Sequence, residues 1–285
     1  MIHFGPGGNC NWFKESGKKT SDQMPAFLNE IGLDAYEVEC GRGVRMNAAV
    51  AQRLREEAEA FGTTLSIHAP YYISMSSVEP EKRAKSVDYL LESAALARKI
   101  GAKRIIFHSG SCARLGREEA TALALQTLQA ALDAFDQAGY GDLVLCPETM
   151  GKINQLGSLD EVMTLCALDE RLLPTIDFGH LNAREQGLFY KAEDYERVLE
   201  TIEDALGAWR AAHFHAHFSK IEYTTGGEKR HLTFEDRLFG PEFEPLAEVL
   251  AKRGASPVII CESAGTQSKD ALEMKRIYEK VSAIK

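Results

Sequence analysis

Histidines gather in one short stretch of the chain, His213–His231, which reads HFHAHFSKIEYTTGGEKRH and holds four of the eight histidines. Imidazole ligates transition metals and exchanges protons near neutral pH, so a cluster of this kind indicates a metal or proton-transfer site. A metal ion needs further ligands, and these must come from other parts of the chain.

Other His, Asp and Glu residues recur at the ends of short apolar or β-branched runs. From the third run onward, each run closes on or near one of them: His68, His108, Glu148, Asp177, His215 and Glu262. His180 follows shortly after Asp177, and His231 lies on the long segment after the seventh run. If the runs are parallel strands of one barrel, these side chains share one mouth, where crowded carboxylates would repel one another unless cations were bound.

The apolar runs alternate with longer amphipathic segments, which predicts an α/β fold, a single (β/α)8 TIM barrel over residues 1–285 with its site at the C-terminal face of the strands. No GxGxxG motif follows a strand, which disfavours an open doubly wound sheet. Strands are expected at Ile2–Gly5, Ala35–Glu39, Thr64–His68, Arg104–His108, Leu143–Glu148, Leu173–Asp177, Ala212–Ala216 and Val258–Glu262. Helices are expected at Asn47–Phe61, Glu81–Ile100, Arg117–Ala138, Ala192–Leu206, Phe243–Arg253 and Lys269–Val281.

Composition favours a cytoplasmic enzyme. No apolar run reaches the ~18–20 residues that span a bilayer, and the N-terminus lacks the features of a signal peptide, so no membrane partner is expected. The six cysteines form no CxxC pair, which indicates reduced thiols rather than a disulfide framework or a zinc ribbon. The net charge of −9 weighs against a nucleic-acid partner, although bound divalent ions would add positive charge at the mouth.

The mixture of imidazole and carboxylate suits zinc, manganese or iron better than magnesium. Glu148 has two carboxylate oxygens and could bridge a pair of ions. Two ions roughly 3.5–4 Å apart can activate a water and stabilise both oxygens of a phosphoester displacement. Ser109 and Ser111 follow His108, but no GxSxG motif surrounds them, so a nucleophilic serine is not indicated.

Six motifs in order resemble those of the endonuclease IV family of apurinic/apyrimidinic endonucleases, within the xylose-isomerase-like superfamily. They are SIHAPYYISM (66–75), IIFHSGS (105–111), PETMGKINQLGSLDE (147–161), TIDFGHLNAREQG (175–187), HFHAHFSK (213–220) with the later KRH (229–231), and CES (261–263). Sugar isomerases and epimerases of the superfamily share the Glu, Asp-x-x-His, His, Glu skeleton, so the resemblance is more specific for the superfamily than for the activity.

The resemblance implies a centre of three zinc ions. One ion would be held by His68, His108 and Glu148, and a second by Glu148, Asp177, His215 and Glu262. The third would be held by His180 and His231 with an Asp two residues before the final His. Lys229 stands there instead and would repel a cation, which leaves two or three ions open, with Glu228 as a substitute ligand. Manganese or iron could replace zinc.

The same resemblance suggests how DNA would be held. Tyr71 matches a family tyrosine that presses on DNA at the lesion, which fits an aromatic wedge in an opened duplex. The candidate phosphate contacts on the same face are Arg42, Lys220, Lys229 and Arg230, with Arg45, Arg114 and Arg117 near them. The family's Asn-Asp-Ser-Lys reads His217-Phe218-Ser219-Lys220 here. His213 and His217 share strand parity with His215 and are expected inside the barrel or behind the ligands.

The leading expectation is therefore a monomeric, zinc-dependent DNA phosphodiesterase of base excision repair. It would hydrolyse the phosphodiester 5′ to an abasic site, with Glu148 or Glu262 as the catalytic residue that orients the water. A sugar isomerase or epimerase, in which Glu148 and Glu262 flank a single ion, is the alternative. A third interpretation, motivated by Lys229, is a DNA-binding barrel without turnover.

Overall fold

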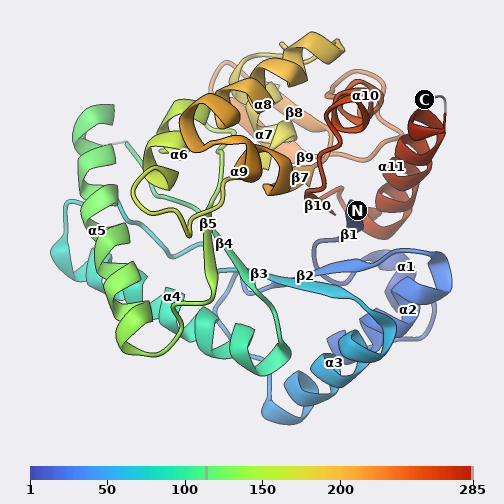
Figure 1. Cartoon of the computed structure of the whole chain (residues 1–285), viewed down its shortest axis with the longest axis horizontal. Coiled ribbons are helices and arrows are strands. Elements are labelled where there is room, and N and C mark those ends of the chain that lie inside the picture. The colour runs from blue at the N-terminus through green and yellow to red at the C-terminus, as the bar shows by residue number, and fades with distance from the viewer. Residues whose placement is uncertain (113–114, 284–285) are drawn as a thin grey trace.

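A computed structural model describes residues 1–112 and 115–283, in which eight parallel strands are surrounded by helices (Figure 1). The parallel strands are β1 (His3–Pro6), β2 (Ala35–Glu39), β3 (Thr64–His68), β4 (Arg104–Phe107), β5 (Val144–Pro147), β6 (Thr175–Asp177), β7 (His215–Phe218) and β10 (Val258–Cys261). All but β7 lie within two residues of their predicted ends.

The strands form two four-stranded parallel sheets, in the orders β1-β10-β7-β6 and β2-β3-β4-β5. Single parallel bridges, Gly7 to Glu37 and Glu148 to Thr175, join the two sheets at both of their free edges. A Cβ on Gly5 would lie 1.6 Å from the carbonyl oxygen of Ala35, so only glycine allows β1 and β2 to approach this closely. The predicted TIM barrel is therefore confirmed.

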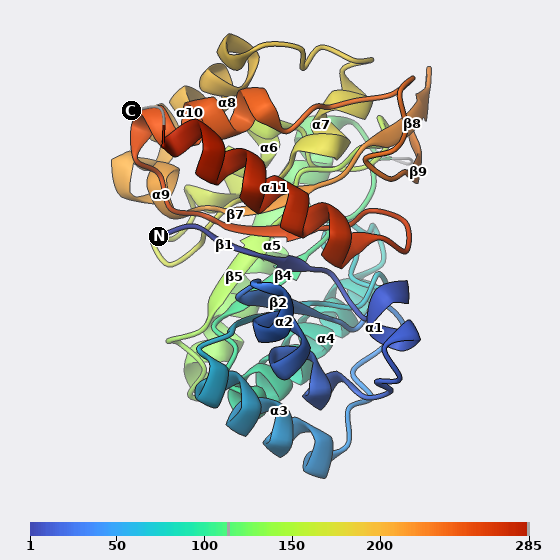
Figure 2. The same cartoon turned by 90° about the vertical axis from the view of Figure 1, so that its right-hand side faces the viewer.

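Helices cover the outside of the strands, and all six predicted helices are found with ends within two residues (Figures 1 and 2). They are α3 (Ala48–Phe61), α4 (Pro80–Ile100), α5 (Arg117–Gln137), α8 (Ala192–Leu206), α10 (Glu244–Arg253) and α11 (Gln267–Ser282). The further helices are α1 (Asn11–Glu15), η1 (Ser21–Gln23), α2 (Met24–Ile31), α6 (Leu159–Cys166), α7 (Phe178–Arg184) and α9 (Ala208–His213). None of the helices in the described part of the chain has the length and apolar character needed to cross a membrane.

The long segment after β7 folds as an antiparallel hairpin of β8 (Ile221–Thr224) and β9 (Gly227–His231). Figure 2 shows this hairpin beyond the C-terminal ends of the strands, at the same end as α7. The hairpin places His231, at the end of β9, in the lining of the cavity at the barrel mouth.

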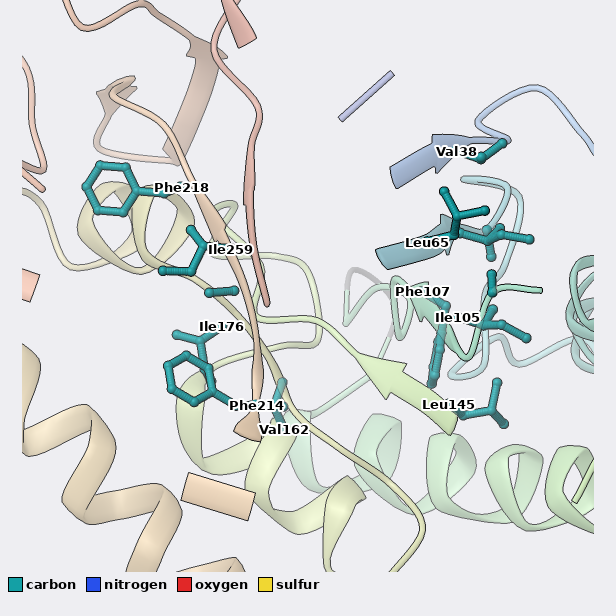
Figure 3. Close-up of a cluster of buried hydrophobic side chains, with 14 of the residues drawn as sticks. Val38, Leu65, Ile105, Phe107, Leu145, Val162, Ile176, Phe214, Phe218 and Ile259 are labelled. Atoms are coloured by element: carbon teal, nitrogen blue, oxygen red, sulfur yellow. The ribbon is translucent and has the colours of Figure 1, made fainter. Parts of the chain in front are cut away.

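The apolar core lies mainly between strands and helices. Outward-facing strand residues such as Val38, Leu65 and Ile105 form one part of it, and Ile176 and Ile259 contribute to another (Figure 3). The barrel interior holds smaller apolar clusters, of which Ala35, Val258 and Ile260 make one and Ile106, Cys146 and Leu173 another. Between these clusters and the mouth lies a polar layer that includes the fully buried Glu37, His215 and His217.

The predicted strand Ala212–Ala216 was wrong in register. Ala212 and His213 belong to α9, where the His213 ring stacks on Trp209 with centroids 4.8 Å apart. The strand begins at His215, three residues later than predicted, and ends at Phe218, two residues later. As a result, His217 rather than His215 is the histidine nearest the mouth.

Helix α6 positions the segment that follows Glu148, and a capping box fixes its start. The Ser158 hydroxyl accepts from the Glu161 N–H at 3.3 Å, and a Glu161 carboxylate oxygen accepts from the Ser158 N–H at 2.8 Å. Ser158→Ala is expected to lower the free energy of unfolding by about 1 kcal/mol. Urea denaturation measures this loss. Ser256→Ala, in the loop between α10 and β10, serves as the comparison, and equal stabilities of the two variants would contradict the prediction.

Candidate metal centre

A cavity of about 530 Å³ opens at the C-terminal ends of the strands. Six of the eight predicted ligands line it: His68, His108, Glu148, His180, His231 and Glu262. A seventh, Asp177, is fully buried against this lining. The eighth, His215, is elsewhere, as described below.

The first group of ligand atoms comes from β3, β4 and β5. The Nε2 atoms of His68 and His108 both lie 3.2 Å from Oε2 of Glu148. The two imidazole rings stand nearly perpendicular, with centroids 5.0 Å apart. Three ligand atoms therefore converge from the three strand ends, as the resemblance implies.

The second group contains Glu148, Asp177, Glu262 and His217. Nδ1 of His217 lies 3.3 Å from Oε1 of Glu148 and 3.5 Å from Oε1 of Glu262. Glu148 thus belongs to both groups, one oxygen facing each. Oδ2 of Asp177 is buried without a hydrogen bond among the described residues and lies 3.3 Å from Nδ1 of His180, so an ion could use this oxygen as a ligand.

The structure does not bring His215, which was predicted as a ligand, into this second group. Its Nε2 lies 3.0 Å from Oε2 of Glu37, deeper in the barrel, and burial lowers its pKa to about 4. Because strand side chains alternate, His215 and His217 face the same side, but a two-residue step displaces one from the other by roughly 6.6 Å along the strand. His217 occupies the level of the mouth and His215 the level below.

The third group comprises His180, Glu228 and His231. Nε2 of His180 lies 3.4 Å from a carboxylate oxygen of Glu228, and the rings of His180 and His231 are 5.5 Å apart. Lys229 is exposed and pairs with Glu222 on the hairpin. The carboxylate that completes this group is therefore Glu228, the substitute considered for the missing Asp.

The histidines of the three groups are held by their second ring nitrogens. Nδ1 of His68 lies 3.0 Å from the carbonyl oxygen of Ala69, and Nδ1 of His180 lies 3.0 Å from that of Thr149. A carbonyl oxygen only accepts, so these nitrogens carry a proton, and the neutral form of each ring would present its Nε2 lone pair to an ion. Nδ1 of His231 likewise contacts the Ser219 hydroxyl at 2.8 Å. Metal-binding histidines are commonly anchored in this way.

The spacing of the ligand atoms fits metal ions. Zinc bonds of about 2.0–2.1 Å in tetrahedral geometry place neighbouring ligand atoms roughly 3.3 Å apart. The contacts of Glu148 with His68, His108 and His217, and of His180 with Glu228, range from 3.2 to 3.4 Å. Three groups with this donor set suit zinc, manganese or iron.

The pKa values of Glu148 and Glu262 are shifted in opposite directions. Burial alone would raise the pKa of Glu148, but the positive charges of His217 and His108 hold it well below its usual value. Burial, with the nearby charges of Glu148 and Asp177, raises the pKa of Glu262 to about 8. The crowded negative charges are therefore costly, and a cation would relieve them.

Comparison with known proteins shows the family of the chain. Residues 25–279 match the model of the family described as "Xylose isomerase-like TIM barrel". The chain belongs to the xylose isomerase-like TIM barrel family. An uncharacterized protein of Methanocaldococcus jannaschii is 33% identical over 248 residues, covering 87% of this chain and 88% of its own. A probable endonuclease 4 of Mycoplasma pneumoniae is 27% identical, covering 73% and 70%.

Solved structures in the comparison share the fold. Endonuclease IV from Thermus thermophilus superposes with a TM-score of 0.69 at 21% identity, covering 99% of this chain and 100% of that one. A D-tagatose 3-epimerase-like protein gives a TM-score of 0.72 at 18% identity, covering 99% and 98%. The same fold is therefore found in a protein named as an endonuclease and in one named as epimerase-like.

The predicted DNA-contacting residues differ in exposure and in their ion-pair partners. Tyr71 is 60% exposed at the edge of the cavity, and Arg42 is exposed on the loop after β2. Arg230 is exposed and, like Lys229, pairs with Glu222. Arg114 lies outside the described residues.

Lys220, a predicted phosphate contact, is buried rather than exposed on the rim of the cavity. Its side chain is buried, and Nζ donates to a Glu242 carboxylate at 2.6 Å and to the Asp236 carbonyl at 2.8 Å. This lysine holds together the chain that follows β9.

Two glutamates near the centre were missed by sequence reasoning. Glu37 is fully buried beneath the second group, and Glu39 lines the cavity beside His68. Both lie at alternate positions of the predicted strand Ala35–Glu39, in an otherwise apolar run. Since alternate residues face one side of a strand, this pattern was the signal that could have found them.

Glu228→Gln is expected to weaken the binding of one zinc ion at least about 10-fold, because a neutral amide replaces the carboxylate of the third group. Competition with a zinc-binding dye measures this. The neighbouring Lys229→Gln is the matched control, and its zinc affinity should stay within about twofold of the wild type. A stronger effect of the Lys229 variant would contradict the assignment.

Proposed function

We propose that this chain is a divalent-metal-dependent apurinic/apyrimidinic endonuclease that hydrolyses the DNA phosphodiester 5′ to an abasic site. The observation that carries the proposal is the set of three ligand groups around one cavity, with Glu148 shared between two of them. Such a set exceeds what a single-ion enzyme needs. The likeness to the probable endonuclease 4 of Mycoplasma pneumoniae supports the same chemistry.

The residues present have distinct tasks in this proposal. His68, His108 and Glu148 would hold one ion; Glu148, Asp177, His217 and Glu262 a second; and His180, Glu228 and His231 a third. When bound, divalent ions supply Lewis acidity for water activation and for the charge that develops on the phosphate. Zinc fits these groups, and manganese or iron are alternatives.

The catalytic carboxylates differ in access. The Glu262 side chain is 16% exposed and that of Glu148 is 1% exposed. We therefore assign Glu262 the orientation of the attacking water, and Glu148 the holding of the site. Burial of the other ligands excludes bulk water from the reacting groups and strengthens each polar contact.

DNA binding would use the rim of the cavity. The Tyr71 ring packs against Gly41, where an added Cβ would lie 2.3 Å from it, and remains 60% exposed. An exposed aromatic ring of this kind can wedge into an opened duplex. Arg42, Lys229 and Arg230 would contact phosphates. Bound divalent ions would add positive charge at the mouth of the barrel, although the chain as a whole is acidic.

The test is incision of a DNA duplex that contains one tetrahydrofuran residue as an abasic-site analogue. Zinc- or manganese-loaded protein is expected to produce a single nick 5′ to the analogue and to leave the matched undamaged duplex intact. Glu148→Gln protein, purified identically, controls for contaminating nucleases. An uncut duplex, under conditions in which a known abasic endonuclease cuts it, would refute the proposal.

A sugar epimerase or isomerase is the second candidate. The group of Glu148, Asp177, His217 and Glu262 contains four ligands by itself, enough for one ion with carboxylates on both sides of a bound sugar. The D-tagatose 3-epimerase-like neighbour gives this candidate its support. Two results would favour this candidate over the endonuclease. The first is a metal content of one ion per chain, and the second is epimerisation of a free ketose, detected by chromatography.

A further inference from the structure

Glu37 is a fully buried carboxylate in the barrel interior, directly beneath the second ligand group. The Ser66 hydroxyl donates to its Oε2 at 2.7 Å, and Nε2 of His215 lies 3.0 Å from the same oxygen. Its other oxygen, Oε1, lies 2.8 Å from Nε2 of His217. Glu37 therefore joins β2 to β3 and, across the barrel, to β7.

This carboxylate is expensive to bury. Removing a charge from water costs several kcal/mol even after the protein relaxes, and only well-placed partners offset the cost. The neighbouring interior is filled by apolar clusters such as Ala35, Val258 and Ile260, so packing alone does not require a charge at this level. A functional reason for the residue is indicated.

The contact distances argue against a further ion between Glu37 and the two histidines. Zinc ligands would stand roughly 3.3 Å apart, whereas Glu37 approaches His217 at 2.8 Å and His215 at 3.0 Å. These separations are typical of hydrogen-bonded groups. The atoms concerned, Oε1 of Glu37 and Nε2 of both histidines, are buried and make no hydrogen bond of regular geometry among the described residues, so the pairing is a close charged contact.

We propose that Glu37 is a positioning residue that fixes the tautomer and orientation of His217. Nδ1 contacts Glu148 in this structure; with an ion bound in the second group, the Glu37 oxygen beside Nε2 would keep the proton there and leave the Nδ1 lone pair for the ion. Nδ1 is the atom that faces Glu148 at 3.3 Å and Glu262 at 3.5 Å. Ser66 and His215 occupy the other oxygen of Glu37 and so keep the carboxylate aimed at His217.

This inference rests on the metal centre of the proposed function, but not on its DNA substrate. Replacing such an anchoring group typically weakens metal affinity 10–100-fold without removing a ligand. The effect should be confined to the ion of the second group, since Glu37 contacts none of the ligands of the first and third groups in the described residues.

The test is Glu37→Gln, assayed by zinc competition with a chelating dye and by the visible spectrum of the cobalt-loaded protein. We expect one ion to bind about 10-fold or more weakly and its cobalt absorption to shift, with the remaining ions unchanged. The control is Asp34→Asn, which alters another His–carboxylate pair, with His3, just before β2 at the opposite end of the barrel. It should bind zinc as the wild type does.

Ser66→Ala provides a second variant in case the Glu37 variant does not fold. Losing one hydrogen bond to Oε2 should weaken the same ion roughly fivefold. Wild-type zinc affinity and cobalt spectrum in folded Glu37→Gln, or in folded Ser66→Ala where the first variant fails, would overturn the inference. Wild-type protein that binds zinc but leaves abasic DNA uncut would refute the proposed function alone, and wild-type protein that binds no divalent ion would refute both.

Discussion

Glu148→Gln is expected to reduce incision of abasic DNA at least about 10³-fold, the largest loss of any single substitution in this chain. One oxygen of Glu148 faces His68 and His108, and the other faces His217 and His180. The amide keeps the shape but loses the charge, so two ligand groups are disrupted at once. Initial rates on the tetrahydrofuran duplex and the metal content of the purified protein measure the effect.

Glu203→Gln is the matched control for this substitution, because Glu203 pairs with Arg253 on the outer ring of helices. It should retain wild-type rates and metal content. A Glu148 variant that keeps all its metal and cuts within tenfold of the wild type would contradict the bridging position assigned to this carboxylate.

His217→Gln is expected to lose at least about 10²-fold in rate together with one metal ion, whereas His215→Gln should lose less than about 10-fold. The two histidines form a matched pair on β7, both fully buried and two residues apart. Nδ1 of His217 faces Glu148 and Glu262, while His215 reaches only as far as Glu37. Rates and metal content of both variants, measured side by side, test this order.

The reverse order, with His215→Gln the more damaging and metal lost from that variant alone, would restore the ligand set suggested by the sequence. Circular dichroism of both variants separates loss of ligation from loss of folding. A His217 variant that is folded, fully loaded and active would remove His217 from the centre.

Sequence patterns were sufficient to predict the barrel and most of its elements. Apolar runs and amphipathic segments alternate clearly in this chain, and α8, β2 and β3 have the predicted bounds. The seventh strand was misplaced because Ala212 and His213 have no strong strand preference, and the short helix α9 continues through them. Moving the end of a strand by two residues leaves the same alternate side chains facing inward, so the alternation of apolar residues could not reveal the error.

The candidate site was predictable where a ligand ends a strand, as with His68 and Asp177. It was less predictable where two residues of the same type share one face, because strand parity does not show which lies at the mouth. Glu228 and Lys229 are neighbours on β9, so the register of the β8–β9 hairpin decides which of them faces the cavity. Glu228 lines the cavity, and Lys229 pairs with Glu222. Glu37 was missed because its partners are brought together across the barrel only by folding.

X-ray diffraction from zinc-soaked crystals, with anomalous differences recorded above the zinc edge, tests the central claim most directly. Our account predicts three anomalous peaks at the mouth of the barrel: one between His68 and His108, one beside Nδ1 of His217, and one between His180 and Glu228. A single peak, or a peak at His215 with none beside His217, would contradict it.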